Sequence, residues 1–328
     1  MDAMFVIVRA VHFGALVALL GGLVFTVSIA GTGRSSGDAI GGRRSRAAID
    51  SSALWLALAM GSGLAWLGLE AATMSGQPLG EALGRKTLDT VLTGTDFGQV
   101  WLARGALSLL LAGLLVLASR RSPTARRGML VLGAIAAAAL LSSLALVGHA
   151  NAEHGAARAI HLVADAIHLL AAGAWLGALI PLAAWLGAPI AAGNGRTLDG
   201  VAGAVHRFSS LGLLSVSTLL VTGLVNASFT VVTIPALLAT RYGALLLVKL
   251  AMFVAMLALA AINRLRLTPS LADAAVEASA RAAIVARLRR NVIAEVAFGV
   301  VILVVVGALG RTMPAAQASA MAPTMPMR

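Results

Sequence analysis

The chain has 328 residues, of which 59% are hydrophobic and 12% are charged, and its formal net charge is +12. Such a composition leaves no room for a large soluble domain, and the basic residues lie in short segments between apolar runs, which argues against a nucleic-acid-binding surface. The absence of cysteine excludes disulfides, thiolate chemistry and cysteine-ligated zinc or iron–sulfur sites.

Apolar runs recur along the chain, each long enough to cross about 30 Å of hydrocarbon as a helix. Lone strands are excluded there, because their backbone groups would go unpaired in lipid. We therefore predict an all-α polytopic membrane protein whose bundle of about eight transmembrane helices forms one domain over residues 1–310. The predicted spans are residues 4–30, 51–73, 97–119, 128–148, 158–186, 208–230, 242–264 and 290–310. The first run lacks a basic start and a cleavage site, so we expect it to remain as a span.

Basic residues are distributed unequally between the connecting segments. Sixteen lie in the segments on one side, and six lie on the other side. The richer segments are residues 31–50, 120–127, 187–207 and 264–290. Because positively charged loops stay in the cytoplasm, this bias places both termini in the periplasm.

Three further segments lie outside the spans. Residues 74–96 are expected to form a short interfacial helix on the outer side. Residues 267–289 begin with Thr268 and Pro269, a favourable helix start, and should form a surface helix or extend the last span. Residues 311–328, rich in Met, Ala and Pro, are expected to be a disordered periplasmic tail.

Histidines are concentrated around the fifth span, where four fall within twenty residues. A polar group in hydrocarbon costs several kcal/mol unless it is paired, and imidazole binds transition metals, so the cluster predicts a metal site. His161, Asp165 and His168 are spaced i, i+4 and i+7 and share one helix face. Asp165 could ligate the metal or orient an imidazole. The predicted metal ligands are His12, His149, His154, His161, Asp165 and His168.

Other polar residues lie at a similar depth, in the outer half of the spans. The inner half is nearly apolar, apart from Asn263 and Glu295. This distribution predicts an outward-facing polar cavity rather than a continuous channel. Its expected lining, besides the histidines, is Glu70, Trp101, Arg104, Tyr242 and Lys249. The alternative is structural: single histidines can join helices by hydrogen bonds, and the buried cations can pair with acidic side chains or backbone carbonyls.

The tail contributes soft ligands on the same predicted side as the histidines. Thioether sulfur favours Cu(I), which raises copper above zinc or nickel as the expected metal, although methionine is also ordinary filler in such tails. The predicted auxiliary capture residues are Met313, Met321, Met325 and Met327.

Several stretches, taken in order, resemble the CopD/PcoD family of bacterial inner-membrane copper-resistance proteins. They are residues 97–104, 168–177, 207–227, 242–250 and 261–266, with His12 upstream and Glu295 in the last span. The resemblance implies copper resistance or uptake across the inner membrane alongside a periplasmic copper carrier of the CopC type. It does not supply the copper ligands.

We therefore expect a multi-pass protein of the bacterial inner membrane that binds copper at the periplasmic face and transports it, with import as the expected direction. The sequence contains no nucleotide-binding motif, so transport should be passive or ion-coupled and the protein is expected not to be an enzyme. Its expected partners are the CopC-like carrier and membrane lipid, not nucleic acid. The alternatives are a membrane b-type haem protein with two histidine ligands, and a copper sensor or assembly partner that does not transport.

Overall fold

A computed structural model describes residues 2–30, 38–147, 155–189, 197–231, 233–273 and 275–314. They form helices and no strand, and eight helices are long and apolar enough to cross a membrane, which confirms the predicted fold class. The eight are α1 (Asp2–Val24, continued by the π-helix η1, Phe25–Ala30), α2 (Asp38–Ser75), α5 (Asp96–Arg120), α6 (Pro123–Ser142), α7 (Gly155–Gly187), α8 (Leu198–Thr230), α10 (Arg241–Ile262) and α12 (Ala278–Leu309).

Short helices occupy several connecting segments. They are α3 (Leu79–Ala82), α4 (Arg85–Gly94), the 3-10 turn η2 (Ser143–Val147), α9 (Ile234–Ala239), the π-helix η5 (Asn263–Leu267) and α11 (Thr268–Ala272). The first two confirm the helix expected within residues 74–96. α9 was not predicted, because its six residues are too few to show a helical period.

The helices α2, α8 and α12 begin two turns or more before the predicted spans, at the arginine-rich end of the bundle. Hydropathy marks where a helix enters lipid, whereas backbone hydrogen bonding continues beyond that point. Of the two alternatives for residues 267–289, the extension of the last span is therefore confirmed from Ala278 onward. The extensions of α8 and α12 are joined by an ion pair, 2.5 Å long, between Asp199 and Arg281.

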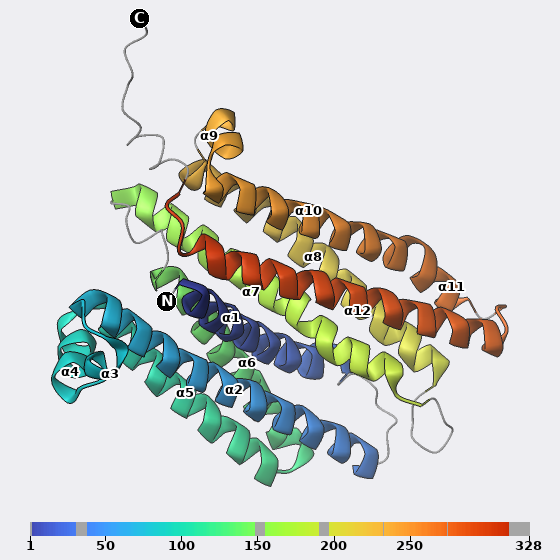
Figure 1. Cartoon of the computed structure of the whole chain (residues 1–328). Helices are drawn as coiled ribbons and strands as arrows, with labels where there is room; N and C mark the ends of the chain where they lie inside the picture. The colour runs from blue at the N-terminus through green and yellow to red at the C-terminus, as the bar shows by residue number, and fades with distance from the viewer. Residues whose placement is uncertain are drawn as a thin grey trace, which may run out of the picture.

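The central helices are α1 and α7, which pack against each other (Figure 1). α1 also contacts α2, α6 and α12, whereas α7 contacts α8 and α12, and α10 lies on α12. At the α1–α7 crossing, a Cβ atom added to Gly21 would lie 2.1 Å from the carbonyl carbon of Gly177, so only glycine permits this approach.

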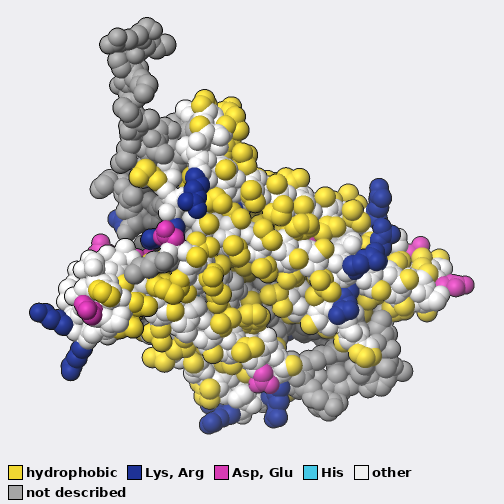
Figure 2. All heavy atoms as spheres, in the orientation of Figure 1, with side chains coloured by type: hydrophobic (Ala, Val, Ile, Leu, Met, Phe, Trp, Pro, Cys, Tyr) yellow, Lys and Arg dark blue, Asp and Glu magenta, His cyan; other side chains and the backbone are white. Residues whose placement is uncertain are grey.

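The two described ends of the chain meet at one face, where Arg311 lies 3.3 Å from Asp2. Figure 2 shows hydrophobic side chains over the flank of the bundle and most charged side chains near its two ends, the distribution expected of a protein surrounded by lipid. An even number of spans is consistent with termini on one side. The placement of both termini in the periplasm remains a prediction from the charge bias.

Candidate functional site

His12 is the centre of a first polar group, between α1, α2 and α5. Its side chain is 3% exposed. Nδ1 lies 3.0 Å from the carbonyl oxygen of Ala59, and Nε2 lies 2.5 Å from Nη2 of Arg104. A carbonyl only accepts and a guanidinium only donates, so these partners select the neutral tautomer with the proton on Nδ1. The lone pair of Nε2 is therefore taken by Arg104.

The Arg104 guanidinium is fixed by groups at the end of α6 and the start of η2. Its Nη1 donates to the Leu140 carbonyl oxygen at 3.2 Å and to the Ser143 hydroxyl at 2.6 Å. Backbone carbonyls were among the partners expected for the buried cations, and this pairing is confirmed for Arg104. Desolvation of the guanidinium is thereby offset by directed acceptors.

Aromatic rings surround this first group. Trp66 and Trp101 approach His12 edge to face, with ring centroids 5.5 and 5.6 Å away. The guanidinium of Arg104 lies 4.6 Å from the Trp101 ring, and that of Arg9 lies 4.5 Å from the Trp66 ring, so both cations gain cation–π stabilisation. Glu70, predicted to line the cavity, accepts a hydrogen bond from Trp66 at 3.0 Å.

A second group lies on the face of α7 that packs against α8. His161 stacks on Phe229 with the ring centroids 4.6 Å apart, and His168 Nδ1 lies 2.9 Å from the Thr222 hydroxyl. The spacing of His161, Asp165 and His168 predicted one shared face. Contacts of all three with α8 confirm it, since Asn226 Nδ2 lies 3.5 Å from the Asp165 carboxylate.

Lys249 and Tyr242 extend the second group onto α10. Lys249 is half-buried and close enough to Asp165 and His168 for its charge to act on both. Tyr242 is buried and hydrogen-bonded to Thr230. The carboxylate of Asp165 therefore lies beside a cation, and its negative charge is partly balanced in the apolar interior.

The two groups differ in what their unpaired buried atoms can do. In the first group, the buried atoms without a hydrogen-bond partner among the described residues are Arg9 Nε, Trp101 Nε1 and Arg104 Nε. These are donors only, so they offer no lone pair to a metal. In the second group, the corresponding atoms are His161 Nδ1 and Asn226 Oδ1. An imidazole nitrogen can present a lone pair, and an amide oxygen always does.

The predicted ligands are thus divided between two groups packed between different helices, rather than gathered at one point. Within the described ranges, no three His, Asp or Glu side chains are placed to hold one metal ion. His149 and His154 lie outside the described residues, as do Met321, Met325 and Met327. Met313 is described and half exposed, just beyond α12. The predicted metal site stays a prediction, and its described part is the second group.

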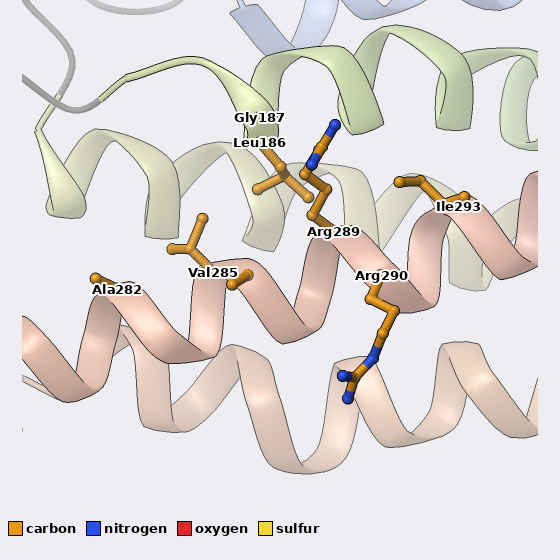
Figure 3. A pocket seen from close by; sticks show the side chains of 8 residues that line it. Leu186, Gly187, Ala282, Val285, Arg289, Arg290 and Ile293 are labelled. Carbon is orange, nitrogen blue, oxygen red and sulfur yellow. The ribbon is translucent and has the colours of Figure 1, made fainter.

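At the arginine-rich end of the bundle, Asn263 and Glu295, the two polar residues expected within an otherwise apolar half, form a pair. Asn263 Nδ2 donates to Glu295 Oε1 at 2.8 Å, beside a hollow of about 330 Å³. A second hollow of about 460 Å³ lies between the end of α7 and α12; there Arg289 points toward α7 and Arg290 points away from it (Figure 3). The pairing of Asn263 with Glu295 could have been expected from the sequence, because an amide and a carboxylate lie at the same depth in neighbouring spans.

Two family models match the chain. Residues 1–160 match the copper resistance protein D-like N-terminal domain, and residues 202–309 match copper resistance protein D. The chain is also 30% identical over 232 residues to "Copper resistance protein D" of Pseudomonas syringae pv. tomato, an alignment that covers 70% of this chain and 73% of that protein. The chain belongs to the copper resistance protein D family. The resemblance noted in the sequence is confirmed, and membership supports a role in copper resistance.

The two family matches cover different parts of the candidate site. The first group, around His12 and Arg104, lies in the N-terminal match, and the α8, α10 and α12 residues lie in the C-terminal match. His161, Asp165 and His168 fall on α7, between the two matched regions. α7 therefore connects the two matched regions, and it carries His161 and His168.

Proposed function

We propose that the protein binds copper at its periplasmic face and carries it inward across the bacterial inner membrane, and that this activity underlies its role in copper resistance. The observation that carries the proposal is His161 Nδ1, which is buried in a side chain 5% exposed and has no hydrogen-bond partner among the described residues. A buried nitrogen of this kind is unfavourable unless it is satisfied, and copper binding would satisfy it.

His168 supplies a second available nitrogen. The Thr222 hydroxyl donates to the Thr218 carbonyl oxygen at 2.6 Å, so it accepts from His168 Nδ1, which leaves the lone pair on Nε2. Seven residues separate His161 from His168, a rise of about 10 Å along the helix. One ion cannot bind directly to both at that separation. The two imidazoles therefore act as successive sites along α7, with Asp165 between them.

The order of residues along the chain suggests how copper would reach the two α7 histidines. His149 and His154 precede α7 and would meet copper first. The methionine-rich tail and a CopC-like periplasmic carrier would raise its local concentration. We propose no catalytic step, since moving an ion from ligand to ligand breaks no covalent bond. Lys249 opposes an incoming cation, and Asp165 offsets that charge.

The haem alternative requires two free histidine nitrogens facing one another. His12 does not supply one, because both of its nitrogens are engaged, by Ala59 and by Arg104. Purified protein lacking a Soret absorption band would exclude haem, and a band would favour it. Copper flux into proteoliposomes separates a transporter from a sensor or assembly partner.

The full-length protein, purified and reconstituted, tests the proposal directly. His161→Ala and His168→Ala should each weaken copper binding and slow copper uptake, because water replaces imidazole poorly as a ligand of Cu(I). Asp165→Asn should lower affinity about ten- to a hundredfold if the carboxylate orients an imidazole. Elemental analysis and uptake of copper into vesicles are the measurements.

The control for this experiment is His206→Ala. His206 is exposed at the arginine-rich end of α8, away from the second group, so its removal should leave copper binding unchanged. Each variant must retain the wild-type unfolding temperature, since a histidine that merely joins helices would also lower activity when removed. Wild-type copper stoichiometry and uptake in a well-folded His161→Ala/His168→Ala double variant would overturn the proposal.

A further inference from the structure

The hollow of about 330 Å³ at the arginine-rich end of the bundle has properties that copper transport does not explain. It lies between α7, α8, the α10–η5–α11 segment and α12, and its walls include Trp175, Phe208 and Leu257. Two lining residues, Leu213 on α8 and Leu265 on η5, are 53% and 72% exposed. Because apolar side chains exposed on a spanning segment face lipid, the hollow opens sideways into the membrane.

A polar group lies within these apolar walls. Glu295, which is 1% exposed, accepts from Asn263 through Oε1, and Asn263 Oδ1 accepts in turn from Asn291 Nδ2 at 2.8 Å. This chain fixes the orientation of the Asn263 amide. The other carboxyl oxygen, Glu295 Oε2, is buried and has no hydrogen-bond partner among the described residues. A buried carboxyl oxygen without a partner is unfavourable by an amount comparable to a lost hydrogen bond.

The nearby cation does not satisfy this oxygen. Arg264 lines the hollow, but its Nη1 donates to the Ser209 backbone and hydroxyl oxygens, at 3.1 and 2.8 Å. That pairing joins η5 to α8 at the edge of the hollow. Asn263, Arg264 and Leu265 all come from the π-helical turn η5, and such turns occur frequently at functional sites.

We propose that this hollow binds a membrane-soluble aromatic alcohol, a molecule of the phenol class with an apolar body. Its hydroxyl group pairs with Glu295 Oε2, and its ring lies against Trp175 and Phe208. A hydroxyl both donates and accepts, so it satisfies Oε2 whether the carboxyl is ionised or protonated. The aromatic side chains of the walls favour a ring over an alkyl chain, because edge and stacked ring contacts add to the energy of apolar burial.

Size and charge support the same class of ligand. The volume falls at the small end of ordinary ligand pockets, which matches a single ring with a short apolar substituent. A cationic head group would be repelled by Arg264 and by the exposed Arg289 and Arg290 at the same end of the bundle, and an anionic one would meet the Glu295 carboxyl, so a neutral head group is favoured. The lateral opening selects a ligand that is dissolved in the membrane.

Photolabelling of the full-length protein in nanodiscs tests this proposal. The probe is a 4-alkylphenol with a diazirine in its alkyl chain, and labelled peptides are identified by mass spectrometry. We expect saturable labelling of α8 and of the Asn263–Leu267 turn. The competitor 4-nonylphenol should displace the probe at a concentration about tenfold or more below that of nonylbenzene, the effect of one buried hydrogen bond.

Variants connect this preference to the carboxyl group. Glu295→Leu should abolish the preference for nonylphenol, whereas Glu295→Gln should retain it, because an amide also pairs with a hydroxyl. Glu81→Leu removes an exposed carboxyl on α3, at the opposite end of the bundle, and should leave the preference for nonylphenol unchanged. If Glu295→Leu does not fold, Leu213→Trp on the exposed edge of the hollow provides the second test. The larger side chain should block labelling while leaving the Glu295–Asn263 pair intact.

Three results would overturn the proposal. The first is equal competition by nonylphenol and nonylbenzene, and the second is a preference that survives in folded Glu295→Leu. The third is displacement by 1-dodecanol as effective as that by nonylphenol, which would reject the aromatic class. None of these measurements depends on copper.

Discussion

The α1–α7 crossing allows a sharp test of the packing, because two adjacent glycines have opposite surroundings. A Cβ atom at Gly21 would lie 2.1 Å from the Gly177 carbonyl carbon and 2.3 Å from the Ala178 nitrogen, whereas at Gly22 it would meet nothing within 4 Å. We predict that Gly21→Ala destabilises the protein and that Gly22→Ala does not.

The magnitude follows from the distances. Ordinary contact of a Cβ atom begins at 3.4 Å, so α1 and α7 must separate by about 1.3 Å to accept the methyl group at Gly21. Overpacking of this kind costs about 1 to 3 kcal/mol, and the contact here is with rigid backbone, which places it at the upper end. Alanine regains about 1 kcal/mol of helix propensity. A net loss of about 2 kcal/mol remains for Gly21→Ala, against a gain of up to about 1 kcal/mol for Gly22→Ala.

The assay is reversible unfolding of the purified protein in mixed micelles, followed by the helical circular dichroism signal. Gly177→Ala should behave like Gly21→Ala, because its Cβ atom would collide with the carbonyl oxygen of Val17. Equal stability of Gly21→Ala and Gly22→Ala would show that the two helices do not cross at these glycines, and would refute the packing argument.

Two further predictions concern the membrane orientation and the tail. The charge bias predicts that an alkaline phosphatase fused after Arg328 is active and that a cytoplasmic reporter at the same point is not; the reverse pattern would place the α7 histidines toward the cytoplasm. Truncation after Met313 should slow copper uptake at scarce copper while leaving saturating uptake unchanged, because a tethered thioether segment raises local concentration without forming the buried site. A loss at saturating copper would assign the tail to the transport path itself.

The spans could be predicted from sequence because length and hydropathy are local properties that lipid imposes on each helix separately. The helix ends could not, since α2, α8 and α12 continue into arginine-rich segments where hydropathy has already fallen. The common face of His161, Asp165 and His168 was predictable from the helical period alone. Their partners on α8 were not, because Thr222, Asn226 and Phe229 become neighbours only when α7 and α8 pack.

The difference between local and tertiary properties also explains why His12 was expected to share a cavity with the α7 histidines but is paired with Arg104 instead. Equal depth in the membrane suggested a shared space for His12 and the α7 histidines, but depth does not specify which side of a helix a residue faces. The pairing of His12 with Arg104 depends on how α1, α2 and α5 are arranged around it. The pairing of Asn263 with Glu295 likewise connects residues on η5 and α12, whose contact is a tertiary property.

The two faces of α7 allow packing and copper binding to be separated experimentally. At 100° per residue, Gly173 and Gly177 lie about 110° and about 150° around the helix from the centre of the face shared by His161, Asp165 and His168. The glycine face packs closely on α1, and the histidine face packs on α8. Gly21→Ala disturbs the α1 side only, so the folded fraction of that variant should bind copper with the wild-type affinity. A loss of affinity in proportion to the loss of stability would instead mean that α1 holds the α7 histidines in place.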